Sequence, residues 1–90
     1  MVSGTIDEGI ITKEYDYGSA SIGSNSSQMI PRPQSYPPST FNGRDLIAMY
    51  VKIKSDYIIA SISWTNKNIM AYNYYSNAQT VSFTVVAFYR

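Results

Sequence analysis

Four carboxylates near the N-terminus are the residues whose types and spacing come closest to supporting chemistry. Asp7 and Glu8 are adjacent, and a β-strand would carry Glu14 and Asp16 on one face. Paired carboxylates could act as general acid and base in glycoside hydrolysis, and all four could ligate calcium through oxygen. No ligand spacing typical of a metal site is present. We therefore expect no metal or cofactor, and interpret the charges as protection of an edge strand against unwanted pairing.

The residue types on which most enzymes rely are missing. The 90-residue sequence contains no histidine and no cysteine. Their absence excludes the Ser-His-Asp arrangement, thiol catalysis and thiolate metal sites. We therefore predict that the chain has no catalytic residues and is not an enzyme.

Two segments rich in aromatic and amide side chains favour a binding role instead. Residues 64–68 read W-T-N-K-N, and residues 72–77 read Y-N-Y-Y-S-N. Tyrosine and tryptophan provide a large contact area at a low entropic cost, while serine and asparagine adapt their hydrogen bonds. The same residue types suit sugars. The candidate ligand-binding residues are Asn66, Asn68, Tyr72, Tyr74, Tyr75 and Asn77, together with Tyr36 in a proline-rich stretch.

Charge, length and hydropathy limit the class of protein further. The net charge is +1 and the basic residues are scattered, which argues against nucleic-acid binding. No apolar run approaches the roughly 18 residues of a membrane span, and the first residues do not form a signal peptide. We expect one domain, residues 1–90, without membrane insertion.

Alternation of apolar and polar residues predicts four strands between Asp45 and Arg90. The predicted strands are residues 46–53, 57–64, 69–74 and 80–89. Because short turns join them at roughly ten-residue spacing, we expect an antiparallel four-strand meander.

The same alternation predicts which side chains are buried. In the first strand we expect the odd-numbered residues 47–53 to face the core. Trp64 is in phase with the apolar residues of its strand, which favours a core position. Tyr72 and Tyr74 could lie on either the buried or the exposed face.

The N-terminal half supplies further strands and a crossing segment. We predict strands at residues 9–17 and 19–22. Residues 23–43 contain all four prolines, between positions 31 and 38, and should cross the surface in an extended form. The result is an all-β fold, a small antiparallel β-sandwich or jelly-roll-like domain. Apolar residues on both strand faces, such as Ile59 and Phe88, suggest that another subunit covers part of the outer surface.

The C-terminal half resembles the receptor-binding tips of tailed-phage fibres and tail-tip proteins. The features that carry the resemblance are the closing strand QTVSFTVVAFYR, residues 79–90, the segment ASISW, residues 60–64, and the low-charge Ser/Asn/Tyr composition. H-type lectin-like sandwiches in some of these fibres look similar. The resemblance implies a homotrimer in the virion, assembled in the host cytoplasm and acting outside the cell. Its partner would be a host-surface glycan or an outer-membrane protein.

Two other functions are compatible with the same sequence. The chain could be a structural component of a virion, with its exposed apolar face buried by neighbouring subunits. It could also be a carbohydrate-binding module attached to an enzyme.

Overall fold

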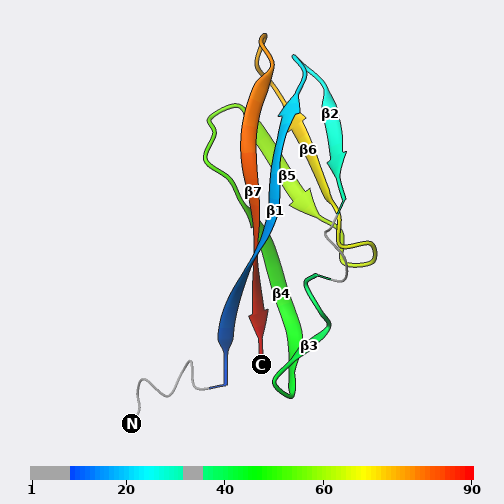
Figure 1. The fold of residues 1–90 in the computed structure, drawn as a ribbon, viewed down its shortest axis with the longest axis vertical. Helices are drawn as coiled ribbons and strands as arrows, with labels where there is room; N and C mark the ends of the chain where they lie inside the picture. Colours follow the sequence, from blue (N-terminus) through cyan, green and yellow to red (C-terminus); the bar gives the residue numbers. More distant parts are fainter. Residues whose placement is uncertain (1–8, 32–35) are drawn as a thin grey trace.

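The computed structural model of the chain describes residues 9–31 and 36–90 and contains seven strands in these ranges (Figure 1). They are β1 (Ile11–Ile22), β2 (Ser27–Ile30), β3 (Thr40–Phe41), β4 (Arg44–Lys52), β5 (Ile58–Ile62), β6 (Ile69–Asn73) and β7 (Gln79–Tyr89). No helix in the described residues is long and apolar enough to span a bilayer.

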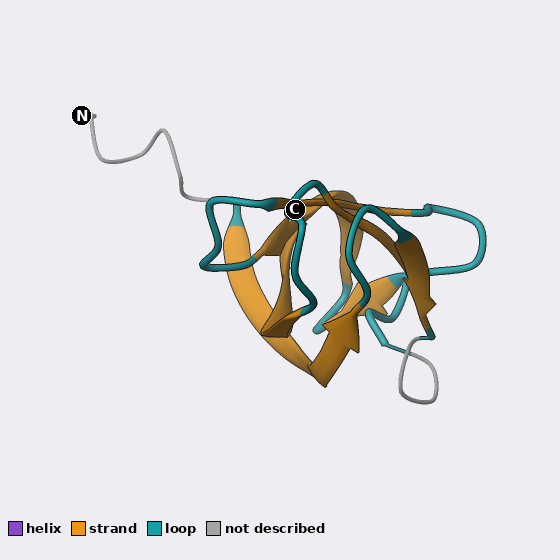
Figure 2. Ribbon diagram, turned by 90° about the horizontal axis from the view of Figure 1, so that it is seen from above, coloured by secondary structure: helices purple, strands orange, loops and turns teal. Residues whose placement is uncertain are grey.

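The strands form two antiparallel sheets. Sheet A has the order β1-β7-β4-β3, and sheet B has the order β2-β6-β5. Sheet B lies beside the upper part of β1 and β7, while β3 and the lower part of sheet A extend beyond it (Figure 1). Seen from above, sheet A curves around one side of the molecule (Figure 2). The prediction of a small antiparallel β-sandwich is confirmed.

The predicted meander is wrong in its pairing order. The four C-terminal strands are present, but β4 and β7 pair within sheet A while β5 and β6 pair within sheet B. A single sheet in sequence order would leave its apolar face uncovered. Placing the β5–β6 hairpin over sheet A buries Ile58 and Ile69 with Phe83 and Val85.

The two predicted N-terminal strands are one strand with a bulge. The pairing of β1 with β7 shifts register between Asp16 and Ser19. Gly18 adopts a positive φ of 81°, and its N–H donates to Asp16 Oδ1 over 2.7 Å. Glycine reaches this conformation without a steric penalty, so the chain bends at Gly18 without ending the strand.

A second bulge changes the buried face of β4. Its pairing with β7 shifts register between Leu46 and Ala48. Met49 and Val51 therefore face the core as predicted, but Ile47 does not and is 45% exposed. The prediction for Ile47 is wrong because an extra residue in a strand reverses the side-chain alternation.

Part of the apolar outer face is covered within the single chain. Val86 on the outer face of β7 is 4% exposed. Its neighbours in register are Glu14 on β1 and Tyr50 on β4. The Lys52–Glu14 ion pair, with an N–O distance of 3.3 Å, bridges β7, and the Tyr50 ring stacks on Phe88. Val86 therefore needs no second subunit to be buried.

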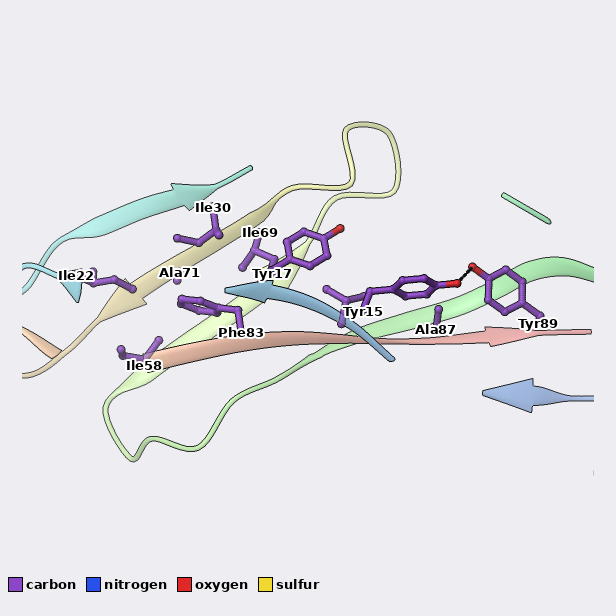
Figure 3. Close-up of a cluster of buried hydrophobic side chains, with 11 residues drawn as sticks. Tyr15, Tyr17, Ile22, Ile30, Ile58, Ile69, Ala71, Phe83, Ala87 and Tyr89 are labelled. Atoms are coloured by element: carbon purple, nitrogen blue, oxygen red, sulfur yellow. Dashed lines mark hydrogen bonds between the residues drawn. The ribbon is translucent and has the colours of Figure 1, made fainter. Parts of the chain in front are cut away.

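The main core lies between the two sheets and continues along the inner face of sheet A (Figure 3). Its buried side chains are Tyr15, Tyr17, Ile22, Ile30, Ile58, Ile69, Ala71, Phe83, Val85, Ala87 and Tyr89. Tyr15 and Tyr89 extend the core beyond the region that sheet B covers, whereas Tyr17 lies beside Ile69 of β6 (Figure 3).

The proline-rich segment packs onto this core. Residues 23–43 are predicted to cross the surface in an extended form, and within them β2 and β3 lie as short edge strands on either side of the prolines. Residues 32–35 lie outside the described residues. Pro37 is fully buried, so the segment is a structural part of the domain.

Three consecutive carbonyls of this segment accept hydrogen bonds from core side chains. Tyr17 donates to the carbonyl of Tyr36 over 2.9 Å, and its hydroxyl also lies 2.8 Å from the carbonyl of Lys67. Lys67 Nζ donates to the carbonyl of Pro37, and the Tyr89 hydroxyl donates to the carbonyl of Pro38, both over 2.9 Å. We call these three bonds the proline clasp.

The Tyr89 hydroxyl is held in its protonated form. It donates its one proton to Pro38, so Tyr15, whose hydroxyl lies 3.2 Å away, must donate to Tyr89 (Figure 3). Burial raises the pKa of Tyr89 well above its ordinary value, and the contact with Tyr15 raises it further. Deprotonation would place a charge in the core and remove the donor to Pro38.

Removing one donor of the proline clasp should destabilise the domain. Tyr17→Phe leaves buried carbonyls without their partner, and we expect a loss of about 1–3 kcal/mol in the free energy of unfolding. The matched control is Tyr50→Phe, at a residue that is 50% exposed, which should change it by less than about 0.5 kcal/mol. Urea unfolding measures both variants. Equal effects at the two positions would contradict a structural role for the Tyr17 hydroxyl.

The domain should lose stability in alkali because of Tyr89. Above pH about 10 the unfolded chain releases the tyrosine proton while the folded chain keeps it, so unfolding becomes easier as the pH rises. Below that pH Tyr89 is protonated in both the folded and the unfolded chain and contributes no pH dependence to the stability. Urea unfolding across this range should show a steeper alkaline decline for the wild type than for Tyr89→Phe. Parallel pH profiles for the two proteins would show that the prediction is wrong.

Candidate functional site

The predicted ligand-binding residues lie at opposite ends of sheet B. Asn66 and Asn68 lie in the turn that precedes β6, whereas Tyr75 and Asn77 lie in the connection that follows it. The structure therefore does not bring the two groups together within one chain. Tyr36 belongs with the first group, because the proline clasp joins its segment to the turn at Lys67.

The first group lies in a tight turn between β5 and β6. The Ser63 N–H donates to the backbone carbonyl of Asn68 over 2.9 Å, and the Lys67 N–H donates to the backbone carbonyl of Ser63 over 2.8 Å. The left-handed residue of the turn is Lys67, with a φ of 58°, and not one of its asparagines. Its ammonium group donates to the buried carbonyl of Pro37. Asn66 remains exposed, and Asn68 donates to Met29 Sδ over 3.1 Å.

The prediction that Trp64 lies in the core is wrong. Its side chain is 52% exposed. The strand alternation ends at Ile62, because the chain turns at Ser63. Trp64 lies in the turn and is free to contact solvent or a ligand.

The second group forms a cluster of four tyrosines, which we call the tyrosine end: Tyr57, Tyr72, Tyr74 and Tyr75. The Tyr57 and Tyr75 rings stack with centroids 4.1 Å apart and an interplanar angle of 15°. The Tyr72 and Tyr74 rings are tilted with centroids 4.4 Å apart. Tyr74 is 60% exposed and Tyr57 is 41% exposed. These contacts hold large aromatic surfaces in place while leaving them open to solvent.

Sequence reasoning did not select Tyr57 as a site residue. It lies opposite Tyr74, whose N–H donates to the Tyr57 carbonyl over 2.8 Å. A signal for this contact was present, because a hairpin joined at residues 63–68 places positions 57 and 74 opposite each other.

Asn73 is a second missed residue, and it holds the loop behind the tyrosine end. Its side chain is fully buried. Its amide nitrogen lies 3.1, 3.2 and 2.9 Å from the carbonyls of Ile22, Gly23 and Asn77, so that its two protons serve three acceptors and one proton is shared. Its amide oxygen accepts from the Tyr75 N–H over 2.9 Å. One amide thus ties the end of β1 to the loop that carries Tyr75.

Asn25, in the turn between β1 and β2, completes the attachment of the tyrosine end. Its N–H donates to the Tyr75 carbonyl, and its own carbonyl accepts from the Tyr72 hydroxyl, both over 3.1 Å. Asn25 adopts a positive φ of 50°, a conformation that asparagine tolerates better than most residues. Tyr75 is therefore fixed through its backbone and Tyr72 through its hydroxyl, while each ring also packs against a second tyrosine, Tyr57 or Tyr74.

The chemistry of the tyrosine end is that of a recognition surface. It offers aromatic faces, hydroxyls and amides, and the strands of sheet B carry no charged residue. Within residues 9–31 and 36–90 there is no pocket and no cluster of acidic residues arranged to hold a metal ion. A ligand would lie on this surface in a shallow contact.

The N-terminal carboxylates are engaged in structural contacts. Glu14 pairs with Lys52, and Asp16 accepts from Gly18 at the β1 bulge. Both lie on β1, which is an edge strand of sheet A as the interpretation of these charges requires. Asp7 and Glu8 lie outside the described residues.

Comparisons with protein-family models, curated proteins and solved structures gave no match.

Asn73 should be essential for the order of the tyrosine end. Asn73→Ala removes the partner of three carbonyls and one N–H in a buried position, so we expect the free energy of unfolding to fall by at least about 2 kcal/mol. The control Ser76→Ala changes an exposed residue of the same loop and should cost less than about 0.5 kcal/mol. Urea unfolding gives both values. A loss below about 1 kcal/mol for Asn73→Ala would contradict this role.

Proposed function

We propose that the chain is a non-catalytic adhesion domain that binds a host-surface glycan through the tyrosine end. The observation that carries this proposal is the pair of ring contacts, Tyr57 with Tyr75 and Tyr72 with Tyr74, at one exposed end of the sandwich. Tyrosine at an exposed position usually has no fixed orientation. Two pairs of tyrosines, each held by a ring contact, support a binding surface.

The physical basis of binding would be stacking supported by hydrogen bonds. Because the rings are already packed together, a ligand would lose little side-chain entropy when it orders them. Phenol hydroxyls and the nearby Asn77 amide could bind sugar hydroxyls. With no charged residue in the strands of sheet B, the affinity should depend little on salt.

The proposal that the ligand is a glycan of a host surface rests on the resemblance of residues 60–64 and 79–90 to phage fibre tips. A non-catalytic role is supported by the lack of histidine and cysteine and by the structural contacts of Glu14 and Asp16. The domain would thus act by surface complementarity, with the sandwich as the rigid support for its loops.

One observation favours a second candidate, a structural role in a virion. Three apolar side chains on the outer face of sheet B are exposed: Met29 (52%), Ile59 (63%) and Met70 (47%). They lie on one face, because Met29 pairs with Met70 and Ile59 pairs with Tyr72 in register. A neighbouring virion protein could cover this face.

Glycan-array binding with tyrosine variants tests the adhesion proposal. We expect the wild type to bind host-surface glycans, and Tyr74→Ala or Tyr72→Ala to lose at least about tenfold in affinity, the equivalent of about 1.4 kcal/mol. The control is Tyr50→Ala, an exposed tyrosine on sheet A, which should retain binding.

Further variants test the choice of loop. Tyr75→Ala with Asn77→Ala should weaken binding, whereas Asn66→Ala with Asn68→Ala at the other end of sheet B should do so less. A protein that binds no glycan but assembles with other virion proteins would favour the structural role. Unchanged binding after loss of Tyr75 and Asn77 would exclude this loop as the site.

A further inference from the structure

The four edge strands of the two sheets differ in their protection against pairing. β1 carries Glu14 and Asp16 and is bulged, and β3 has two residues. β2 has four residues and is followed by Pro31. β5 (Ile58–Ile62) has five residues, with no charge, no proline and no register shift. Natural edge strands usually carry such features because an open edge is a template for another strand.

The hydrogen bonds of β5 show which backbone groups face its open edge. The Tyr74 N–H donates to the Tyr57 carbonyl, and the Ser63 N–H donates to the Asn68 carbonyl. The backbone groups of residues 57 and 63 therefore point toward β6. Because antiparallel strands alternate, residues 59 and 61 also bond toward β6, while Ile58, Ala60 and Ile62 direct their N–H and C=O groups outward. None of the backbone bonds found outside the sheets in the described part of the chain involves these three residues.

We propose that β5 pairs with β5 of a second copy of this chain. The two strands would run antiparallel about a two-fold axis at Ala60, with Ile58 opposite Ile62 of the second copy. The two three-stranded sheets would become one six-stranded sheet. Such a contact is self-complementary and closes at two copies.

The composition of β5 favours a second copy as the occupant. Residues 57–66 contain no charged side chain, so two identical strands meet without like-charge repulsion. Ile59 on the outer face is 63% exposed, and pairing would place it against Ser61 of the second copy. The pairing would also provide partners for the outward backbone groups of three residues in each chain.

This register would unite the two groups of candidate site residues. Tyr57 would lie opposite Ser63 of the second copy, where the β5–β6 turn begins. The turn that carries Asn66 in one chain would then lie beside the tyrosine end of the other. The assembly would present two equivalent composite surfaces on the outer face of one continuous sheet. The pairing itself does not depend on any ligand.

Sedimentation velocity with edge variants tests the pairing. We expect the wild type to form a dimer, and the double variant Ile59→Lys with Ser61→Lys to be monomeric, because each lysine would face a lysine of the second copy. The matched control is Ser27→Lys with Met29→Lys, which places the same charges on the same face at the opposite edge, β2, and should remain dimeric. A monomeric or trimeric wild type, or equal effects of the two double variants, would overturn the proposal.

Cross-linking tests the register directly, because the native chain has no cysteine. Positions 59 and 61 of opposing copies would form a non-hydrogen-bonded pair with Cα atoms about 4.5 Å apart, which permits a disulfide. Ile59→Cys with Ser61→Cys should therefore give a covalent dimer under mild oxidation, and Ile59→Cys alone should give far less. Equal cross-linking by both proteins, or none by the double variant, would contradict the register.

Discussion

The structure depends on satisfying the carbonyls of a segment that cannot form a strand. Sheet B covers only the upper part of sheet A, so the lower inner face needs another cover (Figure 1). The proline segment provides it, but prolines have no N–H and can contribute only acceptors. The donors come from Tyr17 on β1, Tyr89 on β7 and Lys67 in the β5–β6 turn. The proline clasp therefore links both sheets through one segment.

The clasp also accounts for the shape of the β5–β6 turn. Lys67 is only 9% exposed, and an ammonium group is costly to bury without hydrogen bonds. The turn adopts a left-handed conformation at Lys67, and the nitrogen of this side chain bonds to the carbonyl of Pro37. Because the turn begins at Ser63, Trp64 lies outside the strand and is exposed. The same turn therefore buries Lys67 and leaves Trp64 at the surface.

The fold was largely predictable from alternation, and its exceptions have local causes. The strands of the C-terminal half and the core positions of Met49 and Val51 followed from sequence. The exposed positions of Ile47 and Trp64 did not follow from the sequence. A bulge interrupts the alternation at Ile47, and a turn ends it before Trp64. Pairing order depends on how two sheets cover each other, which short-range patterns do not contain. Of the candidate site, Tyr72, Tyr74, Tyr75 and Asn77 were predicted from the sequence. Tyr57 was found only from the pairing of β5 with β6, and Asn73 only from the burial of its side chain.

The distribution of charge connects the fold with its surfaces. Only 14% of the residues are charged, and none lies in a strand of sheet B, while Glu14 and Lys52 form an ion pair across the outer face of sheet A. Charge on an edge or outer face opposes association, so sheet A is protected by charge and the β5 edge of sheet B is not. The unprotected sheet is also the one that carries the tyrosine end. Its outer face and open β5 edge therefore combine the two properties of an interaction surface, exposed apolar area and unpaired backbone.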